Sequence, residues 1–93
     1  MSPRVVEFWV SASAARHMLE RHDVTVEEAL EAAHSTLVFL PGHPARAAGP
    51  DGVMERRYIL PGRTDEGRRL WVIVGYEGGG VARIITAYEA TGS

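Results

Sequence analysis

The order of apolar and polar residues along the chain predicts one β-strand followed by two helices. Residues 5–10 are β-branched and aromatic, which is typical of a strand. Ser11 or Ser13 can then cap a helix, in which apolar residues recur at near-helical spacing up to about Arg21. Thr25 and Glu28 have capping-box spacing, which predicts a second helix from Val26 to about His34.

The rest of the chain predicts a sheet. Residues 36–40 suit a second strand that stops at a Pro-Gly pair, and residues 41–53 form one long loop. Three further strands are expected at about 54–60, 69–76 and 81–88. Short glycine-bearing turns join them, so neighbouring strands should be antiparallel. The predicted fold is a single α+β domain over residues 1–93, with a short β-strand, two helices and an antiparallel β-meander packed on the helices.

Strict alternation assigns the meander side chains to two faces. Strand 69–76 is apolar on both sides, which indicates a central position. In the last strand, alternation places Arg83 and Ala87 on one side, and Thr86 and Tyr88 on the other. If the helices cover one face of the sheet, the other face carries arginines among apolar residues. Such a face suits a shallow binding surface.

Composition and charge narrow the function classes. The 93 residues are 45% apolar and contain no cysteine, so a globular core is expected without disulfides or thiolate metal sites. No apolar run reaches the roughly 18 residues of a membrane span, and no signal-peptide pattern is present, so we expect a cytoplasmic protein. The net charge of −2 argues against long-range attraction to nucleic acid.

The charge is unevenly divided along the chain. Residues 1–53 hold four arginines against seven acidic residues, and residues 54–93 hold six against five. A local basic patch on the C-terminal sheet is therefore compatible with the acidic total. Every basic residue is arginine and none is lysine. Arginine suits bidentate phosphate recognition, but the codon bias of a GC-rich genome explains a whole-chain preference equally well.

Neither a metal centre nor a nucleotide loop is expected. His17 and His22 are five residues apart, which places them about 140° around a helix instead of on one face. The run Gly78-Gly79-Gly80 links two strands and precedes no helix, so it is not a phosphate-binding loop. No cofactor is predicted.

Four sequence motifs occur in an order that resembles the BrnT-type toxins of bacterial type II toxin–antitoxin modules, which share the RelE-like fold. The motifs are His22-Asp23-Val24-Thr25-Val26-Glu27-Glu28-Ala29, Glu55-Arg56-Arg57-Tyr58 with Gly62, Gly67-Arg68, and Arg83-Ile84-Ile85-Thr86-Ala87-Tyr88. Together they span most of residues 7–91. Tyr88 departs from the family pattern, which has arginine at that position.

The resemblance implies a toxin that acts as a metal-independent endoribonuclease and translation inhibitor. Its implied catalytic residues are Arg57, Arg83, His22 and Tyr88, and its implied RNA- or phosphate-binding residues are Arg56, Arg68 and Arg69. The arginines would stabilise phosphate charge, His22 would move a proton, and Tyr88 would donate a hydrogen bond or stack on a base. The implied partners are a small cognate antitoxin and RNA, including ribosome-associated mRNA.

Structural roles remain open for the same residues. Arg57 could pair with Glu55 or Glu89, and Arg68 could lie solvated at the end of a strand. The role of His22 could be limited to terminating its helix. The alternative function is therefore a non-catalytic protein-binding module on the same fold, which Tyr88 in place of arginine favours. Exposed strand edges also allow a homodimer or a toxin–antitoxin hetero-oligomer.

Overall fold

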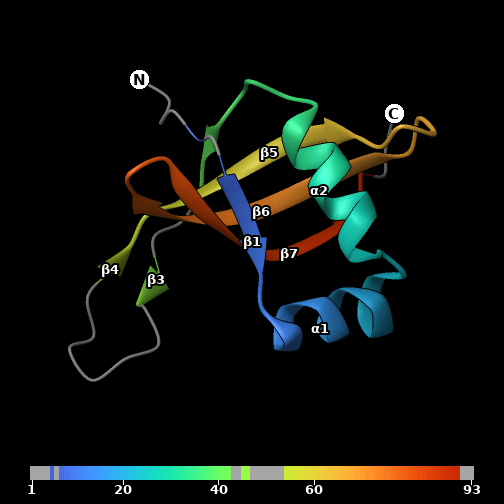
Figure 1. Ribbon diagram of the computed structural model, residues 1–93, viewed down its shortest axis with the longest axis horizontal. Coiled ribbons are helices and arrows are strands. Elements are labelled where there is room, and N and C mark those ends of the chain that lie inside the picture. Colours follow the sequence, from blue (N-terminus) through green and yellow to red (C-terminus); the bar gives the residue numbers. More distant parts are fainter. Residues whose placement is uncertain (1–4, 6, 43–44, 47–53, 91–93) are drawn as a thin grey trace.

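The computed structural model describes residues 5, 7–42, 45–46 and 54–90, and its fold is α+β. The elements in chain order are β1 (Glu7–Val10), α1 (Ala12–His22), α2 (Val26–His34), β2 (Leu40–Pro41), β3 (Ala45–Arg46), β4 (Met54–Glu55), β5 (Arg57–Arg63), β6 (Arg69–Gly78) and β7 (Val81–Glu89). One strand, then two helices, then a meander is the predicted order, so the predicted fold class is confirmed (Figure 1).

The main sheet has five strands in the order β1-β7-β6-β5-β2. The pairs β5–β6 and β6–β7 are antiparallel, as expected for a meander, whereas β1 lies parallel to β7. β6 is central because it pairs along its length with a strand on each side. The first strand thus lies beside the last strand of the meander, and the two helices connect it to β2 at the opposite edge of the sheet (Figure 1).

Local hydrogen bonds explain where the helices begin and end. The Ser11 hydroxyl accepts a hydrogen bond from the Ala14 N–H at 3.1 Å and caps α1. Asp23 ends this helix in the left-handed region, at φ 54°. Thr25 and Glu28 form the predicted capping box, with both reciprocal bonds at 3.1 Å. The capping box placed the start of α2 from the sequence, whereas for α1 the sequence allowed Ser11 or Ser13 and the structure selects Ser11.

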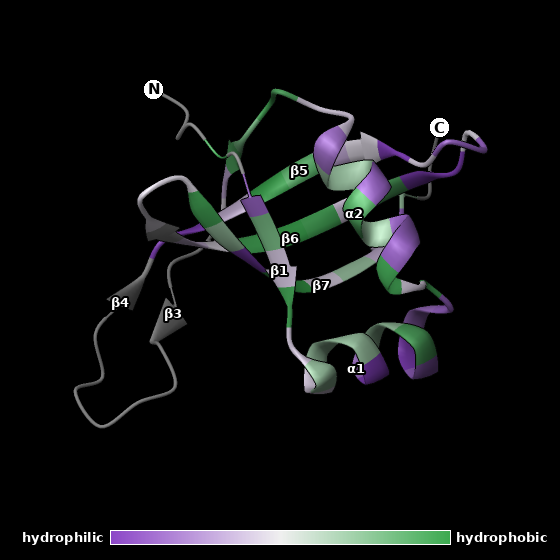
Figure 2. Cartoon of the chain, in the orientation of Figure 1, coloured by the Kyte–Doolittle hydropathy of each residue, from purple (hydrophilic) through white to green (hydrophobic). Residues whose placement is uncertain are grey.

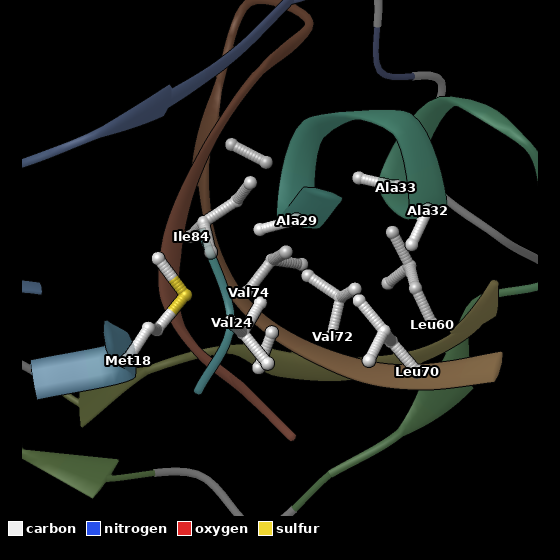
Figure 3. Close-up of a cluster of buried hydrophobic side chains, with 12 residues drawn as sticks. Met18, Val24, Ala29, Ala32, Ala33, Leu60, Leu70, Val72, Val74 and Ile84 are labelled. Carbon is white, nitrogen blue, oxygen red and sulfur yellow. The ribbon is translucent and has the colours of Figure 1, made fainter. Parts of the chain in front are cut away.

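The core lies between the helices and one face of the sheet. Met18 of α1 and the alanines of α2 meet apolar side chains of the meander strands (Figure 3). α2 approaches β5 so closely that a Cβ on Gly62 would lie 2.0 Å from the Ala32 carbonyl oxygen. The fully buried members of this core are Met18, Val24, Ala29, Ala32, Leu60, Leu70, Val72, Val74, Ala82, Ile84 and Ala87. Figure 2 shows the apolar centre of β5 and β6 behind the mixed surface of α2.

Two predicted strand boundaries were wrong. The strand expected at 36–40 is reduced to β2, because the Val38 N–H bonds to the Thr36 hydroxyl and Leu37 points into solvent, 92% exposed. The strand expected at 54–60 is divided into β4 and β5, and β5 continues to Arg63. The predicted loop at 41–53 contains β3, which pairs with β4, and most of the remaining loop lies outside the described residues.

A β-bulge in β7 overturns the predicted faces of the last strand. Ile73 pairs with Thr86 and Val74 pairs with Ile84, so Ile85 is an extra residue without its own partner on β6. Beyond the bulge the alternation is reversed: Ala87 is buried with the core, and Tyr88 turns to the face that carries Arg83. Strict alternation had placed Arg83 and Tyr88 on opposite faces.

Candidate functional site

The face of the sheet opposite the core, here called the outer face, brings two of the predicted arginines into one row. Gly75 of β6 pairs with Arg57 on one side and with Arg83 on the other. Residues directly opposite each other in paired strands project from the same face. Gly75 has no side chain, so no side chain of β6 stands between the two arginines in this row. Trp9 of β1 pairs with Arg83 and extends the row.

Apolar and aromatic residues fill the outer face beyond this row. The strand registers assign to it Trp9 from β1, Arg57, Ile59, Pro61 and Arg63 from β5, Arg69, Trp71, Ile73 and Gly75 from β6, and Arg83, Thr86 and Tyr88 from β7. Trp9 and Tyr88 are 39% and 37% exposed. Proteins that bind single-stranded nucleic acids use exposed aromatic residues to stack on bases and arginines to contact phosphates.

Arg57 and Arg83 are both half-buried. Together with Trp9, each takes part in interactions within the structure. The Nε atom of Arg57 is buried. A guanidinium group that is partly desolvated interacts more strongly with a phosphate than one that is fully solvated.

His22 of α1 and Tyr88 of β7 form a second group, near the end of β7 that extends beyond its pairing with β1. Their ring centroids are 5.6 Å apart, and the His17 ring lies 5.4 Å from that of His22. His17 and His22 are five residues apart on α1, and their rings meet at an interplanar angle of 74°. Within the described residues, no three His, Asp or Glu side chains gather as a metal site would require.

The two groups are separated along the strands. Arg57 and Arg83 flank Gly75, whereas Tyr88 pairs with Trp71, four residues earlier on β6. Four residues of extended chain correspond to about 13 Å. Tyr88 thus shares a face with the arginine pair but lies at a different point on it, and His22 approaches Tyr88 from α1, whose Met18 packs in the core. An extended strand of RNA spans this distance more readily than one phosphodiester group does.

Arg68 immediately precedes β6 and joins three parts of the fold. Its NH1 atom donates to the Asp23 carbonyl at 2.8 Å and to Glu28 Oε2 at 3.0 Å, and its Nε donates to Glu89 Oε2 at 2.9 Å. Its main-chain N–H bonds to the Thr64 hydroxyl at 3.0 Å. Arg68 therefore connects the helix junction to the end of the sheet where β6 begins and β7 ends, and carboxylates already occupy its guanidinium group.

The electrostatics of this cluster agree with a structural role. The hydrogen bond from the Thr25 backbone lowers the pKa of Glu28 below its ordinary value, and the bond from Arg68 lowers it further. The same hydrogen bond to Glu28, followed by that to Glu89, raises the pKa of Arg68. Both members of the pair are thus held in their charged forms at neutral pH.

The remaining predicted residues lie at the ends of β5 and β6. Arg56 is exposed, and its carbonyl accepts the Tyr76 N–H at 3.0 Å. Arg69 is exposed and directly opposite Arg63 on the outer face. The sequence analysis did not single out Arg63, because the strand predicted at about 54–60 ends before Pro61. The continued alternation of Ile59, Pro61 and Arg63 was the signal that would have found it.

Compared with known proteins, the chain matches no protein-family model and no curated protein. The resemblance to BrnT-type toxins therefore rests on the ordered motifs alone. None of the helices in the part of the chain that the structure describes is long and apolar enough to cross a membrane.

Proposed function

We propose that this chain is the toxin component of a bacterial type II toxin–antitoxin system, a metal-independent ribonuclease that inhibits translation and binds RNA on its outer face. The observation that carries the proposal is the row formed by Arg57, Gly75 and Arg83. It aligns two planar cations across the central strand, beside exposed aromatic rings. The ordered motifs shared with BrnT-type toxins supply the type of reaction.

The chemistry assigns separate tasks to the two groups. Cleavage by attack of a ribose 2′-hydroxyl needs cationic donors for the charge that develops on the phosphate, and groups that move protons. Arg57 and Arg83 provide the donors. The His22 imidazole can carry a proton, and Tyr88 carries a phenolic hydroxyl beside it. RNA bound along the strands would contact both groups.

The small antitoxin in this proposal covers the outer face and neutralises its arginines. Such a partner needs acidic residues opposite Arg57 and Arg83 and apolar residues opposite the ring of Trp71. A hetero-oligomer of toxin and antitoxin, formed in the cytoplasm, follows from this arrangement. The outer face then serves RNA and antitoxin in turn, which explains how binding of one excludes the other.

The second candidate function is a non-catalytic protein-binding module on the same fold. The separation of about 13 Å between the arginine pair and the His22–Tyr88 pair favours it, because one phosphate does not lie between both groups. Tyr88, where the resembling family has arginine, points the same way. In this case the outer face binds a protein partner and no RNA is cut.

Inducible expression in bacteria tests the first function against the second. Growth arrest and loss of bulk translation are expected on induction, and Arg57→Ala or Arg83→Ala should abolish both effects. The matched control is Arg16→Ala, which changes an exposed arginine of α1. Unimpaired growth at confirmed soluble expression, in a host without a related antitoxin, would refute the toxin function and leave the binding module.

A gain-of-function variant separates loss of activity from a positive role for the tyrosine. Tyr88→Arg should increase toxicity if the tyrosine weakens phosphate binding at this point of the outer face. The measurement is the inducer concentration that halves the growth rate. An unchanged or higher concentration would indicate that the Tyr88 hydroxyl or ring itself takes part in the function.

A further inference from the structure

A second pair of arginines lies at the other end of the outer face. Arg63 of β5 and Arg69 of β6 are directly opposite each other in the strand register, and both are exposed. Like charges in directly opposed positions destabilise a sheet. A bound anion removes this repulsion, whereas solvent and salt only reduce it.

The local contacts show that acidic side chains are not used to neutralise this pair. The neighbouring Arg68 binds both Glu28 and Glu89. Among the residues that the structure describes, no such ion pair is present for Arg63 or Arg69. Arg68 is therefore bound within the fold, whereas Arg63 and Arg69 present their charge to solvent.

A cleft of about 740 Å³ lies at this position. That volume is within the range of small-molecule sites in proteins. The residues of its lining that bear on a ligand are Arg63, Arg69, Trp71, Ser35, Thr36 and Asp65. The lining includes two arginines and one aspartate, so it carries a net positive charge.

The cleft wall is fixed by bonds between distant parts of the chain. The Arg63 N–H donates to the Ser35 hydroxyl at 2.8 Å, and that hydroxyl donates to the Ala32 carbonyl at 2.7 Å. The Asp65 N–H donates to Glu31 Oε1 at 3.0 Å. The end of α2 and the β5–β6 turn are thus tied together, which holds the arginine-bearing strand ends in place before a ligand arrives.

Trp71 adds a stacking surface at a suitable distance. It is two residues from Arg69 on the same face of β6, which corresponds to about 7 Å along the strand. Trp71 is also one of the residues that line the cleft. A ligand with a phosphate at one end and a flat aromatic ring at the other has this layout, and nucleotides have both groups.

We propose that this cleft binds a nucleotide, with its phosphate between Arg63 and Arg69 and its base against Trp71. The nucleotide is either a free mononucleotide or one residue of an RNA strand, since both present the same phosphate and base. Binding here needs no cleavage and does not involve Arg57 or Arg83. It therefore stands or falls separately from the ribonuclease function.

Tryptophan fluorescence of the full chain tests the proposal. Trp9→Phe leaves Trp71 as the single tryptophan, because the chain has two. We expect AMP to quench its fluorescence with saturation in the micromolar-to-millimolar range, adenosine to bind at least tenfold more weakly, and inorganic phosphate to compete. Arg63→Gln and Arg69→Gln, each made in the Trp9→Phe background, should weaken AMP binding at least tenfold, and Arg16→Gln should leave it unchanged.

Thermal unfolding supplies a readout that is independent of the fluorophore. AMP should raise the midpoint of the starting protein and raise that of the Arg63→Gln/Arg69→Gln double variant by much less. Without ligand, the double variant should unfold at the same or a slightly higher temperature, because the repulsion is gone. This result would also exclude misfolding as the cause of lost binding.

A 2′-O-methyl hexa-adenylate, which cannot be cleaved by 2′-hydroxyl attack, distinguishes the two sources. Binding at least tenfold tighter than that of AMP, with the gain lost in Arg57→Gln, supports an RNA strand that runs across the outer face. Equal binding supports a free mononucleotide. The proposal is overturned if AMP does not bind at millimolar concentration, if adenosine binds as tightly as AMP, or if the double variant binds AMP normally.

Discussion

Replacement of Arg68 by glutamine should destabilise the fold before it affects any ligand. The guanidinium group makes three hydrogen bonds, at 2.8, 3.0 and 2.9 Å, to Asp23, Glu28 and Glu89. Glutamine is too short to reach all three acceptors and carries no charge. The variant should therefore lose the connection between the helix junction and the strand ends.

The magnitude follows from the exposure of each partner. The Glu89 side chain is 57% exposed, so its ion pair contributes little. The Glu28 side chain is 29% exposed, and the Asp23 carbonyl accepts a charge-assisted bond. Hydrogen bonds to charged groups contribute about 1.5–3 kcal/mol each when buried. Discounted for solvent, the loss should be about 2 kcal/mol, or roughly 10 °C in the unfolding midpoint for a domain of this size.

Urea unfolding followed by tryptophan fluorescence measures this loss, with Arg16→Gln as the exposed control. A double-mutant cycle of Arg68→Gln with Glu28→Gln should give a coupling of about 1 kcal/mol. If Arg68→Gln is no less stable than Arg16→Gln, the structural role is refuted. The phosphate-binding role implied by the family resemblance would then be the better account of Arg68.

The same pair should make stability depend on pH. The folded-state pKa of Glu28 is lowered from its ordinary value of 4.5, so its contribution is complete above that value. Stability should fall as the pH drops below about 4.5 and Glu28 becomes protonated in the folded state. The difference between the wild type and Arg68→Gln should shrink over the same interval. A difference that stays constant down to pH 3 would contradict this linkage.

Three further substitutions test other parts of the fold by urea unfolding. Gly62→Ala should cost about 3 kcal/mol, because its Cβ would lie 2.0 Å from the Ala32 carbonyl oxygen; a loss below 1 kcal/mol would mean that α2 moves freely on the sheet. Thr86→Val should stabilise by about 1 kcal/mol, since the Thr86 hydroxyl is buried without a hydrogen bond in the described structure. Thr25→Ala should cost about 1 kcal/mol through the lost capping box, whereas Ser13→Ala, within α1, should change little.

Local sequence patterns were sufficient for much of the fold. The capping pair Thr25–Glu28 placed the start of α2, and apolar residues on both sides of the strand identified β6 as central, because both signals arise from residues close together in the chain. The strand ends were less well predicted. Residues 36–40 have strand composition, but the Thr36 hydroxyl competes for the backbone, and β5 continues through Pro61 because β6 pairs with it there.

The candidate site depended more on tertiary structure. The sequence supplied Arg57, Arg83 and Tyr88 as candidates, but strict alternation placed Tyr88 on the wrong face. A bulge at Ile85 reverses the faces of β7, and a bulge is decided by how a strand pairs with its neighbour. The meeting of Arg57 and Arg83 across Gly75 is likewise a product of strand register.

The sequence by itself thus determined the order of the main elements, the start of α2 and the presence of an arginine-bearing sheet face. Tertiary structure decided which arginines serve the fold and which face solvent. Arg68 bonds to residues 21 to 45 positions away, and Arg63 meets Arg69 only because the hairpin closes in that register. Periodicity and capping act within a few residues, whereas pairing between distant strands and helices fixes the partners of each charged side chain.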